Sequence, residues 1–159
     1  MLEEDLSYLR QNLPQNSMAF GFEDAVKGQA VMGYYITLPT RAEQLAFDGV
    51  MQETLDYLAA SLGATGKSKP IRVKPDLGEA RLASTFVSNQ SGFETRLDML
   101  LFRRGEVSAI LFVFYPDGDK PVVGIIDLAH LLDGRIQGMY EATPSADGNA
   151  NIYTWQQGI

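Results

Sequence analysis

The sequence is poor in the residues that most often build metal and redox centres. Its 159 residues include no cysteine and one histidine. Without cysteine the chain cannot form disulfides, thiolate metal sites or iron–sulfur clusters, and it has no cysteine nucleophile. A single histidine excludes a metal centre that takes several histidines from one chain. We therefore expect no cofactor.

Positive charge is also scarce. Thirteen Lys and Arg stand against twenty Asp and Glu, which gives a formal charge of −7. Phosphate backbones repel an acidic protein unless it carries a local basic patch. One candidate patch is Arg103-Arg104, which precedes a glycine in a predicted hairpin turn. The other is the run Lys67, Lys69, Arg72 and Lys74, which has no interleaved aromatic residues. We interpret both as solvated surface loops and expect no nucleic-acid partner.

The sequence has no apolar run of the roughly 20 residues that span a bilayer. Its first residues, MLEEDLSYLRQNLP, carry acidic side chains where a signal peptide has positive charge and then an apolar run. As given, the sequence predicts a cytoplasmic protein without a transmembrane segment. A lipoprotein-type extracytoplasmic protein trimmed of its export signal would look the same.

The clearest predicted element is a helix over residues 41–62. Thr40-Arg41-Ala42-Glu43 matches a capping box, in which the Thr and Glu side chains satisfy each other's backbone amides. Apolar residues, Val50 and Leu58 among them, then recur on one helical face. Gly63 follows, at a position where a left-handed cap favours glycine. If Val50 and Leu58 lie in the core, replacing either by Ala would cost about 2–5 kcal/mol.

Four runs of apolar, β-branched and aromatic residues predict strands over residues 30–38, 80–88, 93–102 and 107–115. Arg104-Gly105 is a tight connection, so the last two strands are predicted to form an antiparallel hairpin. Residues 63–70, between the predicted helix over 41–62 and the strand over 80–88, are interpreted as a polar connection.

Residues 121–137 allow two interpretations. Strong turn residues precede them, so 122–126 could form a strand. An apolar stripe from Val122 to Ile136 instead favours a helix over 124–137, ending near Gly138. At the two ends of the chain, the pattern predicts a helix over 2–12, a loop over 141–151 and either an edge strand or a frayed end over 152–155. The element order predicts a single α+β domain over 1–159, an α/β/α sandwich with a central, mainly antiparallel sheet.

Two motifs resemble known sites but do not meet their requirements. The segment 63–68 ends in Gly-Lys-Ser, yet a phosphate-binding loop needs four residues between its glycines and runs from a strand into a helix. We interpret it as a helix cap followed by a flexible loop. Asp117-Gly118-Asp119 begins like a calcium loop, but Pro121 and Val122 stand where a ligand and a glycine belong. A turn is the better interpretation.

The one histidine, His130, has apolar neighbours and the acids Asp127 and Asp133 three residues to either side. We expect it to be structural, partly buried on its helix and hydrogen-bonded locally, because no nucleophile motif would present a serine to it. Tyr34-Tyr35 and Trp155 could line a binding site, although aromatic residues on strands more often belong to the core.

Three motifs in the second half occur in an order that resembles the PsbP-like superfamily. They are Leu77-Gly78-Glu79-Ala80, Arg103-Arg104-Gly105 and Arg135-Ile136. This superfamily includes the photosystem II extrinsic protein, a Ran-binding nuclear import factor and many bacterial lipoproteins. The resemblance, over residues 77–137, implies an α/β/α sandwich and a binding role without catalysis. It provides no catalytic residues, and the chain lacks the lipobox cysteine of the exported members.

The sequence therefore leads to two hypotheses of different kinds. The first is a non-enzymatic binding or adaptor module whose partner is another protein; a small-molecule-binding domain is its variant. The second is an enzyme that uses carboxylates with a divalent ion, for which Asp117, Asp119 and Asp127 are the candidates. We expect no catalytic, cofactor or metal residues.

Overall fold

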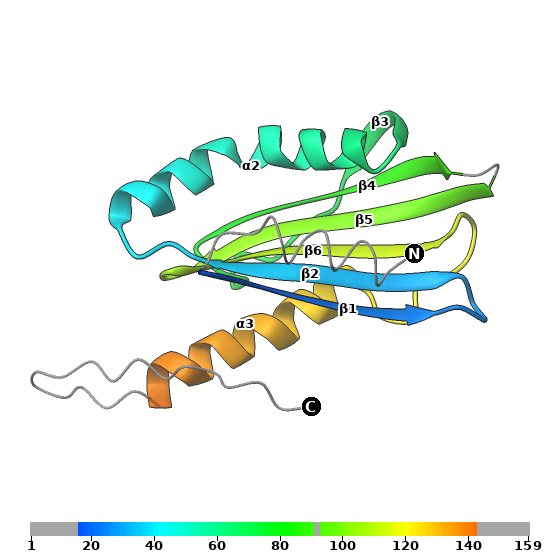
Figure 1. Ribbon diagram of the computed structural model, residues 1–159. Coiled ribbons are helices and arrows are strands. Elements are labelled where there is room, and N and C mark those ends of the chain that lie inside the picture. The colour runs from blue at the N-terminus through cyan, green and yellow to red at the C-terminus, as the bar shows by residue number, and fades with distance from the viewer. Residues whose placement is uncertain (1–15, 91–92, 143–159) are drawn as a thin grey trace, which may run out of the picture.

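The computed structural model describes residues 16–90 and 93–142, which form one antiparallel sheet with a helix on each face (Figure 1). The six strands lie in the order β1-β2-β6-β5-β4-β3. In chain order the elements are β1 (Ser17–Asp24), β2 (Gln29–Thr37), α2 (Arg41–Ser61), β3 (Ala64–Pro70), β4 (Ala80–Gln90), β5 (Phe93–Arg104), β6 (Val107–Pro116) and α3 (Ile125–Ala142). The α+β class is confirmed. The helix predicted over 2–12 and the elements predicted beyond residue 142 lie outside the described residues.

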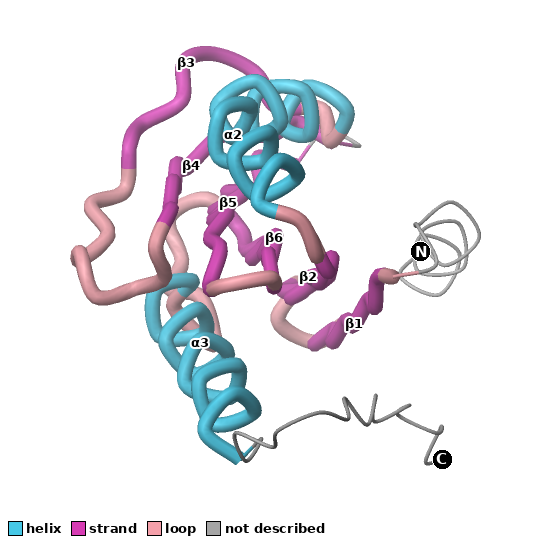
Figure 2. The backbone as a smooth tube through the Cα atoms, turned by 90° about the vertical axis from the view of Figure 1, so that its left-hand side faces the viewer, coloured by secondary structure: helices cyan, strands magenta, loops and turns pink. Residues whose placement is uncertain are grey.

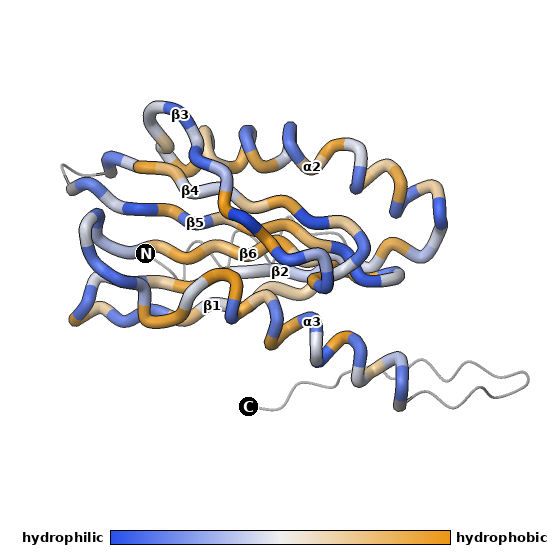
Figure 3. Tube along the Cα trace, turned by 180° about the vertical axis from the view of Figure 1, so that it is seen from behind, coloured by the Kyte–Doolittle hydropathy of each residue, from blue (hydrophilic) through white to orange (hydrophobic). Residues whose placement is uncertain are grey.

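The sheet has an apolar core on each face because successive strand residues point to opposite sides. Leu97, Met99 and Leu101 of β5 pack toward α2, whereas Leu100 and Phe102 pack toward α3. Central strand β6 is buried on both faces, which explains its nearly continuous apolar sequence. Figure 2 shows the strands between the two helices, and Figure 3 shows the apolar run along β6.

Helix α2 begins where the sequence predicts. The Thr40 hydroxyl accepts a hydrogen bond from the Glu43 amide at 3.2 Å, and the Glu43 carboxylate accepts one from the Thr40 amide at 2.9 Å. The buried face, however, carries Met51, Leu55 and Ala59. Val50 is 43% exposed, so its assignment to the core is wrong. Leu58 is half-buried at the edge of the same cluster.

The structure corrects two element predictions. Residues 64–70, interpreted as a polar connection and flexible loop, form edge strand β3, which pairs with β4. An edge strand of polar residues is held by backbone pairing and so lacks the alternation that marks a half-buried strand. The preferred helix over 124–137 is confirmed as α3, and no strand forms over 122–126; the helix begins at Ile125 and continues past the predicted end near Gly138 to Ala142. Among the described residues, neither helix is both long and apolar enough to cross a membrane.

Candidate functional site

A basin opens on the α3 face of the sheet, beside the first turn of α3. Helix α3 begins beneath the middle of the sheet and runs toward the β5–β6 hairpin (Figure 1), so it leaves the opposite end of these strands uncovered. The basin there is shallow and wide open, with a volume of about 360 Å³. It is lined by Ile71, Thr85, Arg96, Asp98, Tyr115, Gly124, Ile125 and Ile126.

Strand pairing places the polar residues of the basin side by side. Asp98 of β5 lies opposite Thr85 of β4, and Arg96 lies opposite Tyr115 of β6. The even-numbered residues of β5 share the α3 face, so Arg96 and Asp98 continue the row that Leu100 begins. The polar floor is therefore fixed by the central sheet and not by a loop.

Asp98 carries the most unusual group in the basin. Only 8% of the residue is exposed, and the Tyr115 hydroxyl donates to its Oδ2 at 3.0 Å. Its Oδ1 and the Oγ1 of Thr85 are buried and have no hydrogen-bond partner among the described residues. Buried polar atoms nearly always have a partner. Asp98 Oδ1 can therefore accept a further hydrogen bond at the floor of this basin, and the Thr85 hydroxyl beside it can accept or donate one.

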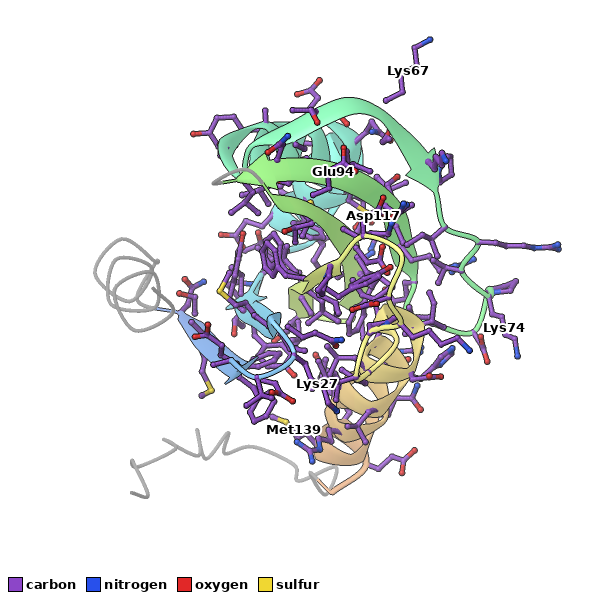
Figure 4. The ribbon with its side chains drawn as sticks, turned by 90° about the vertical axis from the view of Figure 1, so that its right-hand side faces the viewer. Lys27, Lys67, Lys74, Glu94, Asp117 and Met139 are labelled. Atoms are coloured by element: carbon purple, nitrogen blue, oxygen red, sulfur yellow. The ribbon has the colours of Figure 1, made fainter. Side chains whose placement is uncertain are left out.

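At the rim, Arg96 is already paired. Its Nε donates to Asp117 Oδ1 at 2.8 Å, its Nη2 donates to the same oxygen, and this bonding raises the pKa of Arg96. Figure 4 shows Asp117 close to Glu94 at this end of the sheet; the Asp117 amide donates to the Glu94 carbonyl at 3.0 Å. Asp117 thus anchors the turn that follows β6. Within 16–90 and 93–142, no three His, Cys, Asp or Glu side chains come together as metal ligands.

The ionisation of Tyr115 tests the geometry of the floor. Burial, with a contribution from Asp98, raises the pKa of Tyr115 to about 12. Burial alone does the same for Tyr34, which faces α2. We expect Asp98→Asn to lower the pKa of Tyr115 and to leave that of Tyr34 unchanged, measured by NMR of ring-labelled tyrosine. Equal pKa values of Tyr115 in the two proteins would contradict the contact.

The same pKa values fix the direction of the alkaline pH dependence. An unfolded chain loses the tyrosine protons near pH 10, whereas the folded chain retains them to about pH 12. The unfolded state therefore binds fewer protons across this window, and the free energy of unfolding falls as the pH rises.

Arg103 and Arg104, expected to be solvated, instead form ion pairs in which one side chain is buried. The Arg103 side chain is 3% exposed; its guanidinium donates to Asp48 Oδ1 and Oδ2 at 2.8 and 2.7 Å and to Glu79 Oε2 at 2.6 Å. Arg104 points to the opposite face and donates to Asp133 of α3 at 2.8 and 2.6 Å. The solvated interpretation is wrong because each guanidinium finds a carboxylate on a covering helix, which a sequence pattern does not reveal.

The Leu77-Gly78-Glu79-Ala80 segment lies against these two arginines. Gly78 has φ +60°, and a Cβ there would lie 2.6 Å from the Arg103 carbonyl oxygen, so glycine is required. The Gly78 amide donates to Asp133 at 3.4 Å. The Glu79 carboxylate accepts from Arg103 and from the Gly105 amide, and the hydrogen bond from Arg103 lowers its pKa. The motifs at 77–80 and 103–105 therefore form one structural cluster.

The other predicted residues do not form a site. His130 is half-buried as predicted, but its imidazole makes no hydrogen bond within the described part of the chain. Asp133, one of its two acidic neighbours, bonds Arg104 instead. The expectation of a local hydrogen bond is therefore wrong. Tyr34 is buried in the core beneath α2, Tyr35 packs beside Phe20 on the other face, and Trp155 lies outside the described residues.

The basic run lies along the β3 edge of the sheet. Its four side chains are exposed, as predicted, and Figure 4 shows Lys67 and Lys74 projecting from the body. Lys67 and Lys69 belong to β3, where lysine keeps an edge strand from pairing with another chain. Gly63 has φ +74°, in agreement with its predicted role as a helix cap.

Sequence reasoning missed the basin. One signal was present: the α3-facing residues of β5 change from charged at 94, 96 and 98 to apolar at 100 and 102. A helix that covered the whole strand would need an apolar row throughout. The change therefore indicates where the cover of the sheet ends.

Comparison with known proteins does not assign the chain to a family. A scan of protein-family models and a search of curated proteins give no match. Among solved structures, the chain is similar to PA94 from Pseudomonas aeruginosa, a protein of unknown function. The alignment covers 86% of this chain and 89% of that one, with 13% sequence identity and a TM-score of 0.37. A likeness this distant carries no argument about function.

Proposed function

We propose that the protein is a non-enzymatic binding module of the PsbP-like kind, and that its partner, another protein, places a hydrogen-bond donor in the basin beside α3. The observation that carries this proposal is the pair of unpartnered buried oxygens, Asp98 Oδ1, which can only accept, and Thr85 Oγ1, which can accept or donate, at the floor of the basin. The resemblance of residues 77–137 to a superfamily with binding roles supports it, as does the contact between two of its motifs.

NMR titration of the ¹⁵N-labelled protein with small polar fragments of different charge tests the site. We expect at least one fragment to shift the amides of Thr85, Asp98 and Tyr115 together and saturably. Thr85→Met, which fills the floor, is expected to abolish these shifts. Thr65→Met is the matched control, because Thr65 is exposed on β3, outside the basin. Saturable shifts that map only to other surfaces would overturn the proposal.

A further inference from the structure

We propose that the basin binds a primary alkylammonium group, as carried by a lysine side chain or a free amine, between Asp98 and Thr85. This inference rests on the proposed function and names the chemistry that it recognises. Its starting point is the unpartnered carboxylate oxygen of Asp98, which has only lone pairs to offer, beside the Thr85 hydroxyl, which can accept as well as donate. A ligand that satisfies Asp98 Oδ1 must therefore present an N–H or O–H group, and the Thr85 hydroxyl oxygen can accept a second one.

The spacing favours a donor centre with several hydrogens. Asp98 and Thr85 are cross-strand partners on one face of the sheet, and such pairs have Cβ atoms about 4.5–5.5 Å apart. An ammonium group carries three donors on one atom, so it can bond both oxygens at once. The second carboxylate oxygen of Asp98 is held by the Tyr115 hydroxyl at 3.0 Å, which orients Oδ1.

The charges that face the basin favour a cation. Asp98 is negative, and Arg96 is offset by Asp117, to which its guanidinium is hydrogen-bonded. The start of α3 brings the positive end of a helix dipole, but Asp127 in its first turn offsets that charge. The two charged lining residues, Arg96 and Asp98, have opposite signs, so the balance around the basin becomes negative through Asp117 and Asp127, which lie beside it. Its walls, Ile71, Ile125 and Ile126, are apolar and suit the methylene stem of an amine.

Four small probes separate the contribution of positive charge from that of hydrogen-bond donors. They are n-butylammonium, tetramethylammonium, n-butanol and butyrate. We expect n-butylammonium to shift the amides of Thr85 and Asp98 saturably in NMR titrations. Tetramethylammonium has the charge without donors and should bind at least tenfold more weakly, as should the neutral and anionic probes. Asp98→Asn should weaken n-butylammonium binding at least tenfold, whereas Asp119→Asn, an exposed carboxylate nearby, should change it less than twofold.

The outcomes distinguish this inference from the proposed function. If butanol, a neutral donor, binds the basin as tightly as n-butylammonium, the ammonium assignment is overturned and the proposed function stands. If butyrate, which has no donor, binds as tightly, the proposed function is overturned as well. If no probe shifts the amides of the basin, both the ammonium assignment and the proposed function are overturned. The comparison among probes uses the unmodified protein, so it remains decisive if Asp98→Asn fails to fold. A capped Gly-Gly-Lys-Gly-Gly peptide that binds more tightly than n-butylammonium identifies a protein side chain as the source; weaker binding identifies a free amine.

Discussion

Replacing Arg104 by Met is expected to lower the free energy of unfolding by about 3–5 kcal/mol, the cost of leaving a buried charge unpaired. The Asp133 side chain is 4% exposed, and Arg104 is its cationic partner. The Gly78 amide and Gln137 also donate to it, at 3.4 and 3.2 Å, but neither carries charge. Urea unfolding measures the loss.

Two controls isolate the ion pair. Arg72→Met removes an exposed arginine and should change stability by less than about 0.5 kcal/mol. The double variant Arg104→Met/Asp133→Leu removes both charges and should be more stable than Arg104→Met alone, because no buried carboxylate is left without its cation. An Arg104→Met protein as stable as Arg72→Met would contradict the role of the pair.

The pH dependence gives an independent readout of the same contact. Burial alone would raise the pKa of Asp133, but hydrogen bonds from Arg104, Gly78 and Gln137 outweigh it and hold this pKa below its usual value. The folded state therefore binds fewer protons than the unfolded state, so this stabilisation is present at neutral pH and is lost as the pH falls through the folded pKa. The difference in the free energy of unfolding between the wild-type protein and Arg104→Met should therefore become smaller as the pH is lowered.

Leu55→Ala is expected to cost about 2–5 kcal/mol, because it opens a cavity between α2 and the sheet. Leu55 is completely buried, among the apolar side chains that β5 and β6 present to α2. Val50→Ala, on the same helix, should change stability by less than about 0.5 kcal/mol, because Val50 is 43% exposed and Ala has the higher helix propensity. Thermal and urea unfolding of both variants check the difference; equal losses would contradict the placement of α2.

Local signals in the sequence predicted much of the fold. The capping box placed the start of α2, and runs of apolar, β-branched and aromatic residues placed β4, β5 and β6, because these patterns depend on near neighbours in the chain. Strand β3 was missed because its polar residues are held by backbone pairing with β4, which is distant in sequence. Val50 was misplaced because the apolar stripe of α2 is wider than the face that contacts the sheet.

The candidate site was less accessible to sequence reasoning, for a related reason. Asp98 and Thr85 are 13 positions apart and look like ordinary polar residues of two strands. They form the floor of a basin only because α3 begins beneath the middle of the sheet and leaves this end of the strands uncovered. That position is set by tertiary packing and not by the local sequence. The arginines show the same dependence: Arg103 and Arg104 look like a surface pair until Asp48 and Asp133 approach from the two helices.

The opposite directions of Arg103 and Arg104 have a consequence for how β5 finds its place during folding. A slip of one residue would turn every apolar side chain of the strand to the wrong face, so the apolar pattern already excludes it. A slip of two residues keeps every side chain on its own face, so the apolar pattern opposes it less strongly. That slip would carry both guanidiniums about 7 Å along the strand and break the contacts with Asp48 and Asp133 together. The ion pairs of the two arginines therefore disfavour a two-residue slip of β5, which the apolar pattern alone opposes less strongly.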